Sequence, residues 1–389
     1  MGRFIATGIN IGTANITAVV AGYNREQRDF RVRGAGSVLS GGMRKGMIVD
    51  PARVRDQVRS VVKDVERSSG AEVRHAYVGV GGAYLSASRA KGSVMVARAD
   101  GEITENDLER VQSAAREQVS FANRQLLHAV PLSYTIDQDI VLRSPLSMSG
   151  AKLDGEVLFI TNLYRHLQDV VRAVESAGVV VDDLVAAPLA ASRVLLTTQQ
   201  KEVGTALLDF GAETTTLAVF EEGNISGLTT FQIGSVHITQ DIALGLQLPL
   251  REAEQLKCNF RSDPAARRKI HTIVEARLGD VFELVERYLK KIGRNGLLPG
   301  GVVCTGGGML LGNVPELARS TLHLPAELGR VRYFQDTPQY SEDPGFSVAL
   351  GLCVEGLADE ERAGVTHLGV AGIHQARRLV GRWLRAFLP

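Results

Sequence analysis

The chain has 389 residues, of which 44% are hydrophobic and 22% charged, a composition typical of a globular protein with room for more than one domain. Its net charge of +1 excludes a strongly basic surface over the whole body, so we expect no nucleic-acid partner. There is no apolar run of about 18 residues, and the cysteines Cys258, Cys304 and Cys353 lack metal or redox spacing. We therefore expect no membrane span, and three buried cysteines in a reducing, cytoplasmic setting.

The first part of the chain predicts an α/β domain. Residues 3–23 read as two strands around a Gly-Thr turn, and a helix then begins with Asp50 as its N-cap and Pro51 as its first residue. A buried strand follows at residues 75–82. The apolar stripe of the helix consists of Val54, Val58, Val61 and Val65.

The pattern changes between about residues 84 and 155, where strands surround a helix that begins at Thr104. Asp107 follows three residues later, close to a capping box. We interpret this region as a small inserted α+β unit whose ends return to the first domain. A second β-hairpin is then expected at 205–234, a long helical region at 251–292, and a buried strand with a triple-glycine turn at 300–311.

The two hairpins resemble each other. GTANITAVV, from Gly12, aligns with GAETTTLAV, from Gly211, which places Thr17 opposite Thr216 and indicates two related halves. Glycine turns let backbone N–H groups approach a phosphate closely, so hairpins from opposing halves are suited to clamp a triphosphate. Three unrelated turns are the alternative interpretation, and no P-loop motif is present.

Residues 372–389, GIHQARRLVGRWLRAFLP, predict an amphipathic helix with apolar residues at helical spacing, four arginines and no acid. Packing on the protein's own body is the alternative, but a tryptophan and arginines favour an anionic lipid surface. The candidate membrane-binding residues are Ile373, Leu379, Val380, Trp383, Leu384, Phe387, Leu388, Arg377, Arg378, Arg382 and Arg385.

These features resemble the actin/Hsp70/sugar-kinase superfamily and, within it, the FtsA family of bacterial cell-division actin homologues. GGMRKGMIVD, AYVGVGGAYLSA, GEITENDLERV, LLHAVPLSYTID, HITQDIALGL and REAEQLK all read like FtsA segments, in order along the chain. The resemblance implies an α/β, two-lobed actin-like (ribonuclease H-like) fold with an inserted α+β subdomain and a C-terminal amphipathic helix. The implied parts are subdomain 1A (1–81 and 158–200), inserted subdomain 1C (82–157), subdomain 2A (201–233 and 299–356), subdomain 2B (234–298), a linker (357–371) and the membrane-targeting helix (372–389).

The resemblance also implies a site for ATP and Mg²⁺, with no catalytic residue and no direct protein ligand to the metal. Glu254 and Lys257 are one helical turn apart and would flank the adenosine, a surface salt bridge being the alternative. The candidate nucleotide-binding residues are Asn10, Gly12, Thr13, Ala14, Asn15, Asp209, Gly211, Ala212, Glu213, Thr214, Thr215, Glu254, Lys257, Gly306, Gly307, Gly308 and Met309.

Several residues depart from the family pattern at positions that matter for hydrolysis. Asn10 stands where the first hairpin usually begins with Asp or Glu, Ala187 replaces a glutamate, Thr216 stands where Asp is common, and Glu213 replaces a glycine. The chain therefore lacks the carboxylates at positions 10, 187 and 216 that would hold the magnesium ion beside the phosphate and orient an attacking water. We therefore predict a nucleotide-binding scaffold with little or no ATP hydrolysis. Whether Glu213 faces a terminal phosphate or points outward is left open.

The resemblance implies a function in division: polymerisation with other copies of the chain on the cytoplasmic face of the inner membrane at midcell, and tethering of FtsZ through its C-terminal peptide. Arg277 and Asp280 are candidate contacts for that peptide, a solvated helix face being the alternative. Other division proteins would bind the inserted subdomain. The alternative functions are a PilM-like cytoplasmic pilus adaptor and an actin-like ATPase or phosphotransferase.

Overall fold

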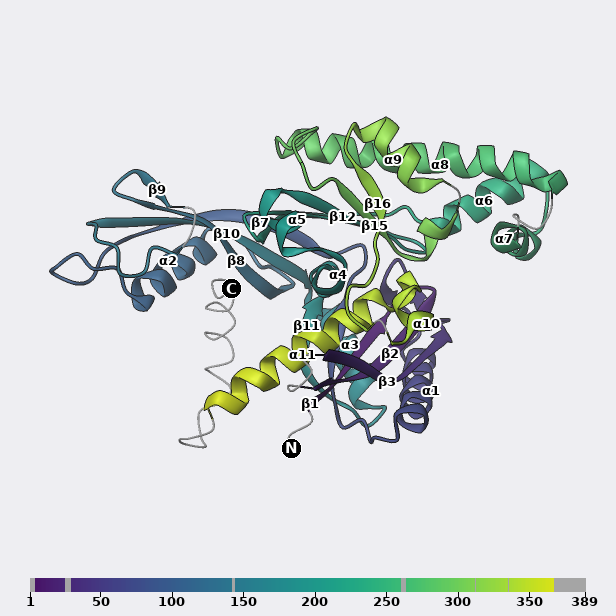
Figure 1. Ribbon diagram of the computed structural model, residues 1–389, viewed down its shortest axis with the longest axis horizontal. Coiled ribbons are helices and arrows are strands. Elements are labelled where there is room, and N and C mark those ends of the chain that lie inside the picture. Colours follow the sequence, from purple (N-terminus) through teal and green to yellow (C-terminus); the bar gives the residue numbers. More distant parts are fainter. Residues whose placement is uncertain are drawn as a thin grey trace.

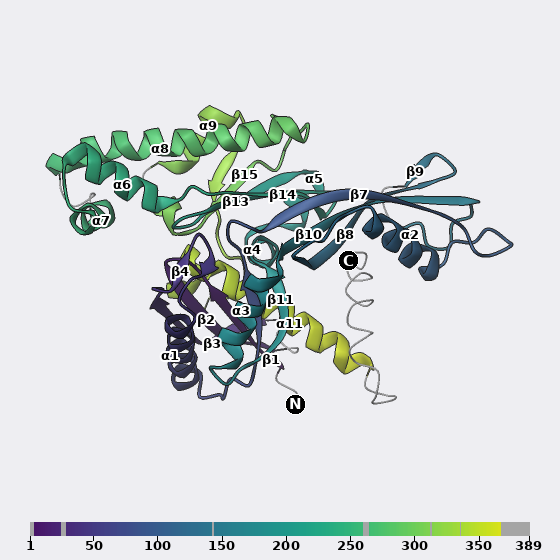
Figure 2. The ribbon, with the colours of Figure 1, turned by 180° about the vertical axis from the view of Figure 1, so that it is seen from behind.

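The computed structural model describes residues 4–24, 29–141, 144–259, 264–311, 313–334 and 336–366, which form two stacked lobes with a sheet domain projecting from one side (Figure 1). Lobe I is the part built on the N-terminal sheet, and lobe II is the part built on the sheet that begins at Thr205. The projecting domain and the helices of lobe II lie at opposite ends of the molecule (Figures 1 and 2).

The sheet of lobe I has the order β11-β6-β1-β2-β3, with β1, β2 and β3 antiparallel and β6 and β11 parallel to β1. Its strands are β1 (Phe4–Ile11), β2 (Asn15–Asn24), β3 (Asp29–Leu39), β6 (His75–Val80) and β11 (Val180–Ala186). Helices α1 (Pro51–Ser69) and α3 (Tyr164–Glu175) pack on one face, and the short ribbon β4 (Met43–Arg44) and β5 (Met47–Ile48) precedes α1.

Helix α1 confirms the prediction from its sequence. The Asp50 carboxylate accepts a hydrogen bond from the Arg53 N–H at 3.1 Å, and the helix ends at Gly70, whose φ of 65° is the left-handed conformation that glycine adopts freely. Burial of each stripe valine stabilises this face by roughly 1.5 kcal/mol or more. The fully buried members are Val54, Val58, Val61 and Val65.

Lobe II repeats the topology of lobe I. Its sheet order is β14-β13-β12-β15-β16, and β12 pairs antiparallel with β13 and parallel with β15, as β1 does with β2 and β6. The strands are β12 (Thr205–Phe210), β13 (Thr215–Glu221), β14 (Asn224–Phe231), β15 (Val302–Thr305) and β16 (Ala326–Leu328). The repeated pairing confirms the two related halves that the hairpin sequences indicated.

The helices of lobe II pack against its sheet around one buried core. They are α6 (Ser235–Leu246), α7 (Leu250–Asn259), α8 (Pro264–Lys291) and α9 (Val314–Leu322). The helical region predicted at 251–292 is helical in its described parts, over α7 as far as Asn259 and over α8 from Pro264.

Two helices join the lobes. Helix α4 (Ala187–Leu195) and helix α11 (Ser347–Thr366) share one apolar cluster with residues of both sheets and lie between the lobes (Figures 1 and 2). A Cβ at Gly351 would lie 1.9 Å from the Ala190 carbonyl oxygen, so only glycine allows this approach of the two helices. Because α11 continues to Thr366, the segment expected as a linker at 357–371 is helical over 357–366.

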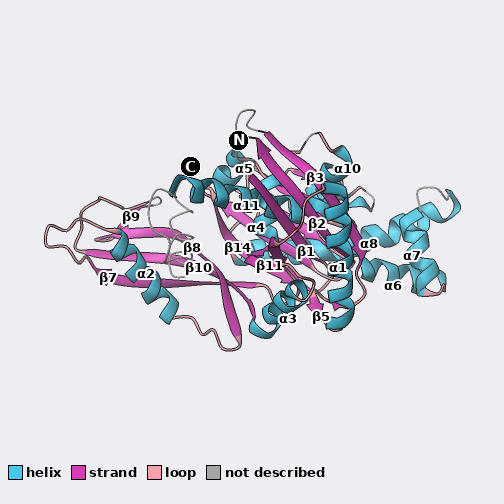
Figure 3. Cartoon of the chain, turned by 90° about the horizontal axis from the view of Figure 1, so that it is seen from below, coloured by secondary structure: helices cyan, strands magenta, loops and turns pink. Residues whose placement is uncertain are grey.

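The inserted domain is a four-stranded antiparallel sheet of order β7-β10-β8-β9 with α2 packed on it (Figure 3). Its elements are β7 (Ser86–Met95), α2 (Glu105–Glu117), β8 (Arg124–Ile136), β9 (Asp139–Val141) and β10 (Lys152–Leu163). The predicted capping box at Thr104 is confirmed, since Thr104 N–H donates to the Asp107 carboxylate at 3.0 Å. Arg89 of β7 donates to the Ser226 carbonyl oxygen of β14 at 2.5 Å, which joins the insert to lobe II.

The cysteines only partly follow the prediction. Cys304 and Cys353 are buried, and burial raises the pKa of each thiol to about 12. Cys258 is exposed near the end of α7, so the expectation that all three are buried is wrong for this residue. Apolar neighbours in the sequence do not reveal which face of a short surface helix a cysteine will occupy.

Candidate nucleotide-binding site

The two hairpin turns have the same local geometry. Gly12 N–H donates to the Asn15 carbonyl at 3.0 Å, and Gly211 N–H donates to the Thr214 carbonyl at 3.0 Å. A Cβ at Gly12 would lie only 2.6 Å from the Asn15 carbonyl oxygen, so this turn requires glycine. Each turn connects the paired strands at the start of its lobe, as the sequence comparison of the hairpins predicts.

The second hairpin lies against the beginning of α6. Ser235 N–H donates to the Gly211 carbonyl at 3.0 Å, and Val236 N–H donates to the Ala212 carbonyl at 2.8 Å. Gly234 approaches Ala212 so closely that a Cβ would lie 2.6 Å from its backbone. The positive end of the α6 dipole is therefore beside this turn, which favours negative charge there.

Asp209 and Asn10 occupy equivalent positions in the two halves, since Asp209 pairs with Thr216 and Asn10 with Thr17. Desolvation raises the pKa of Asp209 to about 6, and no hydrogen bond to its carboxylate occurs within the described part of the chain. Asn10 brings no charge to the other half. Thr216 bonds to the Thr230 hydroxyl at 3.3 Å.

This donor set fits a magnesium ion held mainly by nucleotide oxygens and water. Mg²⁺ commonly takes one or two protein carboxylates and completes its shell with phosphates and water, and Asp209 offers a carboxylate beside Gly306 of the triple-glycine turn. Among residues 4–24, 29–141, 144–259, 264–311, 313–334 and 336–366, no three His, Cys, Asp or Glu side chains cluster as a metal site.

The triple-glycine turn divides into two packing glycines and one open position. A Cβ at Gly306, where φ is 91°, would lie 2.4 Å from the Asp209 carboxylate, and one at Gly308 would lie 2.4 Å from the Phe210 ring. A Cβ at Gly307 would have no neighbouring atom within 4 Å. Met309 is 2% exposed and belongs to the core of lobe II. Of these four candidates, Gly307 has the space to approach a ligand, and the others shape the turn.

The predicted Glu254–Lys257 pair forms, between a buried lysine and a glutamate whose side chain is 48% exposed. The Lys257 side chain is 6% exposed, and its ammonium lies 2.7 Å from the Glu254 carboxylate and 2.9 Å from the Thr239 hydroxyl. It also donates to the Ser235 carbonyl at 3.3 Å, at the start of α6. The network therefore ties α7 to the helix end beside the second hairpin.

The other hairpin candidates differ in exposure. Ala14 and Asn15 are exposed at the first turn, and Thr13 and Thr214 are half-buried. Thr215 is fully buried and donates to the Ile233 carbonyl at 2.7 Å, so its hydroxyl serves the fold. At the start of α4, Ala187 is 8% exposed and its methyl side chain carries no acid or base.

A turn of lobe I that sequence reasoning missed lies between the hairpins. In the β4–β5 ribbon, Gly46 N–H donates to the Thr13 hydroxyl at 3.0 Å, and Lys45 N–H donates to the Glu213 carboxylate. The available signal was Gly46 between two short segments that contain Met43 and Ile48, since glycine after the first turn residue favours a tight hairpin. Glu213, whose direction the sequence left open, therefore points at this turn.

Comparison with known proteins identifies the family. A family profile described as Cell division protein FtsA matches residues 206–351, and one described as SHS2 domain inserted in FTSA matches residues 82–161. The Cell division protein FtsA of Bacillus subtilis (strain 168) is 31% identical over 367 residues, which cover 88% of this chain and 81% of the relative. The chain belongs to the FtsA family. The FtsA of Pseudomonas aeruginosa is 29% identical over 372 residues, covering 90% of this chain and 88% of the relative.

Solved structures establish the actin-like fold of this FtsA-family chain. The PilM-PilN type IV pilus biogenesis complex matches with a TM-score of 0.68 at 20% identity, covering 92% of this chain and 99% of that one. MreB5 of Spiroplasma citri, solved bound to ADP, matches with a TM-score of 0.50 at 13% identity, covering 92% and 97%. The predicted α/β actin-like fold with an inserted α+β subdomain is confirmed, and as an FtsA the chain is a cell-division protein.

Arg277 of this FtsA-family chain is engaged within lobe II. Its guanidinium lies 2.7 and 2.8 Å from the Asp241 carboxylate of α6, and 3.0 Å from Asp280 on its own helix. The Arg277 side chain is 27% exposed and that of Asp280 is 58% exposed. Arg277 thus fastens α8 to α6, and Asp280 presents the more accessible surface.

The candidate membrane-binding residues, all within 372–389, lie outside the described residues, as does the amphipathic helix predicted there. Within residues 4–24, 29–141, 144–259, 264–311, 313–334 and 336–366, no helix has both the length and the apolar character to cross a bilayer.

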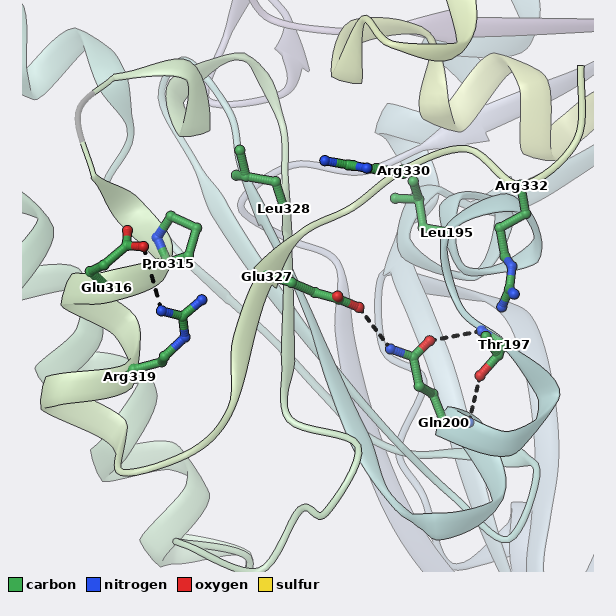
Figure 4. A pocket seen from close by; sticks show the side chains of 10 residues that line it. All are labelled: Leu195, Thr197, Gln200, Pro315, Glu316, Arg319, Glu327, Leu328, Arg330 and Arg332. Carbon is green, nitrogen blue, oxygen red and sulfur yellow. Dashed lines mark hydrogen bonds and ion pairs between the residues drawn. The ribbon is translucent and has the colours of Figure 1, made fainter. Parts of the chain in front are cut away.

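A pocket of about 480 Å³ lies away from the hairpins, where the chain crosses between the FtsA lobes (Figure 4). One side of the pocket is formed by the end of α4 and by α5 (Thr198–Val203). The other side is formed by α9, by β16 and by the segment after β16, which leads to α10 (Pro338–Ser341). Gln200 and Glu327 point toward each other and are joined at 3.0 Å. The lining residues are Leu195, Thr197, Gln200, Pro315, Glu316, Arg319, Glu327, Leu328, Arg330 and Arg332, none of them a nucleotide candidate.

Proposed function

We propose that this FtsA-family chain is an actin-like scaffold that binds an adenine nucleotide between its lobes, assembles with other copies of itself, and attaches FtsZ filaments to the inner membrane. It acts on the cytoplasmic face at the division site. In this proposal its parts are 1A (1–81, 158–200), 1C (82–157), 2A (201–233, 299–356), 2B (234–298), a connection (357–371) that is helical as far as Thr366, and a membrane-binding helix (372–389).

The observation that carries the nucleotide proposal is the matched pair of glycine turns, one from each half, with the same N–H to carbonyl bond of 3.0 Å in each. Backbone amides in such turns bind phosphate oxygens, and the beginning of α6 adds a positive dipole beside the second turn. Asp209 would support Mg²⁺, and the Glu254–Lys257 network lies on the side where the adenosine is expected. The ADP bound to the MreB5 relative is consistent with a nucleotide in this fold.

We propose that hydrolysis is very slow. An alanine at position 187 and an asparagine at position 10 supply neither a base for water nor a second charge for the metal. Ground-state binding depends on backbone amides and the helix dipole, which these substitutions leave intact. The expected behaviour is nucleotide binding with phosphate release near the uncatalysed level.

Membrane attachment is proposed for residues 372–389 from their sequence. Each arginine near anionic headgroups contributes about 1 kcal/mol, and burial of the apolar face adds to this. Folding the helix opposes binding, so one copy should bind reversibly and a filament displaying many copies should bind firmly. Arg277, Asp280 and the neighbouring face of α8 remain the proposed surface for the FtsZ peptide.

The test is co-sedimentation of FtsZ with vesicles that contain anionic lipid, in the presence of the full chain and nucleotide. FtsZ should pellet with the full chain, and should stay in the supernatant with a chain that ends at Gly369 or with a Trp383→Asp variant. Nucleotide binding is measured in parallel by displacement of a fluorescent adenine nucleotide. Equal pelleting of FtsZ with the full and shortened chains would overturn the tethering proposal.

A further inference from the structure

The β4–β5 turn joins the two phosphate hairpins through consecutive backbone amides. Lys45 and Gly46 form the turn, with φ of 51° and 75°. Gly46 N–H donates to Thr13 of the first hairpin at 3.0 Å, and Lys45 N–H donates to Glu213 of the second. Since the two amides are neighbours on one turn, the Thr13 hydroxyl and the Glu213 carboxylate are brought to the same place between the lobes.

The turn is held firmly in this position. Ala83 N–H donates to the Lys45 carbonyl at 2.9 Å, and a Cβ at Gly46 would lie 2.2 Å from the Gly82 Cα. The Lys45 ammonium reaches Gln232 of lobe II at 2.9 Å. The turn therefore cannot slide along the strands without losing contacts to both lobes.

The charge of Glu213 is not neutralised by an ion pair within the described residues. Its carboxylate accepts from a backbone amide, and the nearby Lys45 ammonium is directed at the neutral Gln232. Glu213 is half-buried on the second hairpin, next to Ala212, whose carbonyl accepts from the first turn of α6. A negative charge thus lies between the two turns that are suited to hold a phosphate chain.

We infer that Glu213 determines the phosphate-chain specificity of the site, so that it binds a nucleoside diphosphate more tightly than the triphosphate. The carboxylate accepts the Lys45 N–H donor between the two hairpins, and in this inference it competes with a terminal phosphate for that donor. At about 5 Å and an effective dielectric constant near 20, two like charges repel strongly enough to weaken binding by tenfold or more. The inference rests on the proposed nucleotide site and specifies its ligand.

The experiment is competition of ADP and of ATP, each with Mg²⁺, against a fluorescent ADP analogue on the full chain. The wild type should bind ADP about tenfold or more tightly than ATP. Glu213→Gln keeps an oxygen that can accept from Lys45 N–H but removes the charge, so it should tighten ATP binding about tenfold and leave ADP binding within about twofold. Glu109→Gln, an exposed site on α2 in the inserted domain, changes the net charge equally and should behave as the wild type.

The outcomes separate this inference from the proposed function. Wild-type binding of ATP as tight as that of ADP, or a Glu213→Gln variant with unchanged preference, overturns the inference and leaves the nucleotide site standing. Failure of the folded wild type to bind either nucleotide overturns both. Should Glu213→Gln not fold, Glu213→Ala serves the same comparison, and the wild-type preference alone still decides.

Discussion

Replacing Asp209 with asparagine is expected to stabilise the folded protein while weakening Mg²⁺-dependent nucleotide binding. Desolvation raises the pKa of this carboxyl from its ordinary 3.8 to about 6 in the folded state. Each tenfold change in proton affinity is worth about 1.4 kcal/mol, so the ionised carboxylate costs the folded state up to about 3 kcal/mol at neutral pH. Asp209 keeps some contact with water, which makes this value an upper bound.

The direction in which stability changes with pH follows from the raised pKa of Asp209. The folded state binds this proton more tightly than the unfolded chain, so the contribution of Asp209 to the free energy of unfolding is most favourable below about pH 4, falls as the pH rises toward 6 and is level above that. Asparagine does not titrate. The stability gained by Asp209→Asn should therefore be full at pH 8 and about half as large at pH 5. Mg²⁺-dependent nucleotide binding should strengthen between pH 5 and 7 in the wild type, but not in the variant.

Thermal unfolding at pH 5, 6.5 and 8, followed by calorimetry, measures the effect. At about 2–4 °C for each kcal/mol, the variant should melt several degrees above the wild type at pH 8. Asp56→Asn is the matched control, since that carboxylate is 62% exposed on α1. A variant that melts at or below the wild type at pH 8, or whose gain is equal at pH 5 and 8, would refute the reasoning.

Gly308→Ala should lower the melting temperature by several degrees, because its methyl group would lie 2.4 Å from the Phe210 ring. Gly307→Ala, whose methyl group would face open space, should have almost no effect on the melting temperature. Equal losses in the two variants would contradict this packing. In urea unfolding, a double-mutant cycle of Arg277→Met and Asp241→Asn should give a coupling of about 1 kcal/mol, and a value near zero would mean that the ion pair does not hold α8 on α6. Lys257→Met should cost about 2 kcal/mol, since it removes charge-assisted bonds from a side chain only 6% exposed, and an unchanged urea midpoint would count against the network.

Features that depend on neighbouring residues were predicted well. Short sequence patterns predicted the N-cap and apolar stripe of α1, the capping box at Thr104 and the two hairpins. Each of these features arises from side chains within a few residues of one another. The likeness of the hairpins also predicted the duplicated sheet order, because equal local segments pair in equal ways.

Contacts between distant segments could not be predicted in the same way. Which glycine of the triple turn is open depends on how closely that turn packs on Phe210 and Asp209, about a hundred residues earlier in the chain. The ion pair of Arg277 with Asp241 could not be predicted either, because it depends on the packing of α8 on α6.

By itself, the sequence determined the elements, the duplicated α/β plan and the kinds of residue available to hold phosphate. Only the tertiary structure decided that Glu213 meets the Lys45 turn, because 168 residues separate them and the contact exists only once both lobes are stacked. Local propensity acts over a few residues, whereas a long side chain between two lobes is oriented by the groups that tertiary packing places next to it.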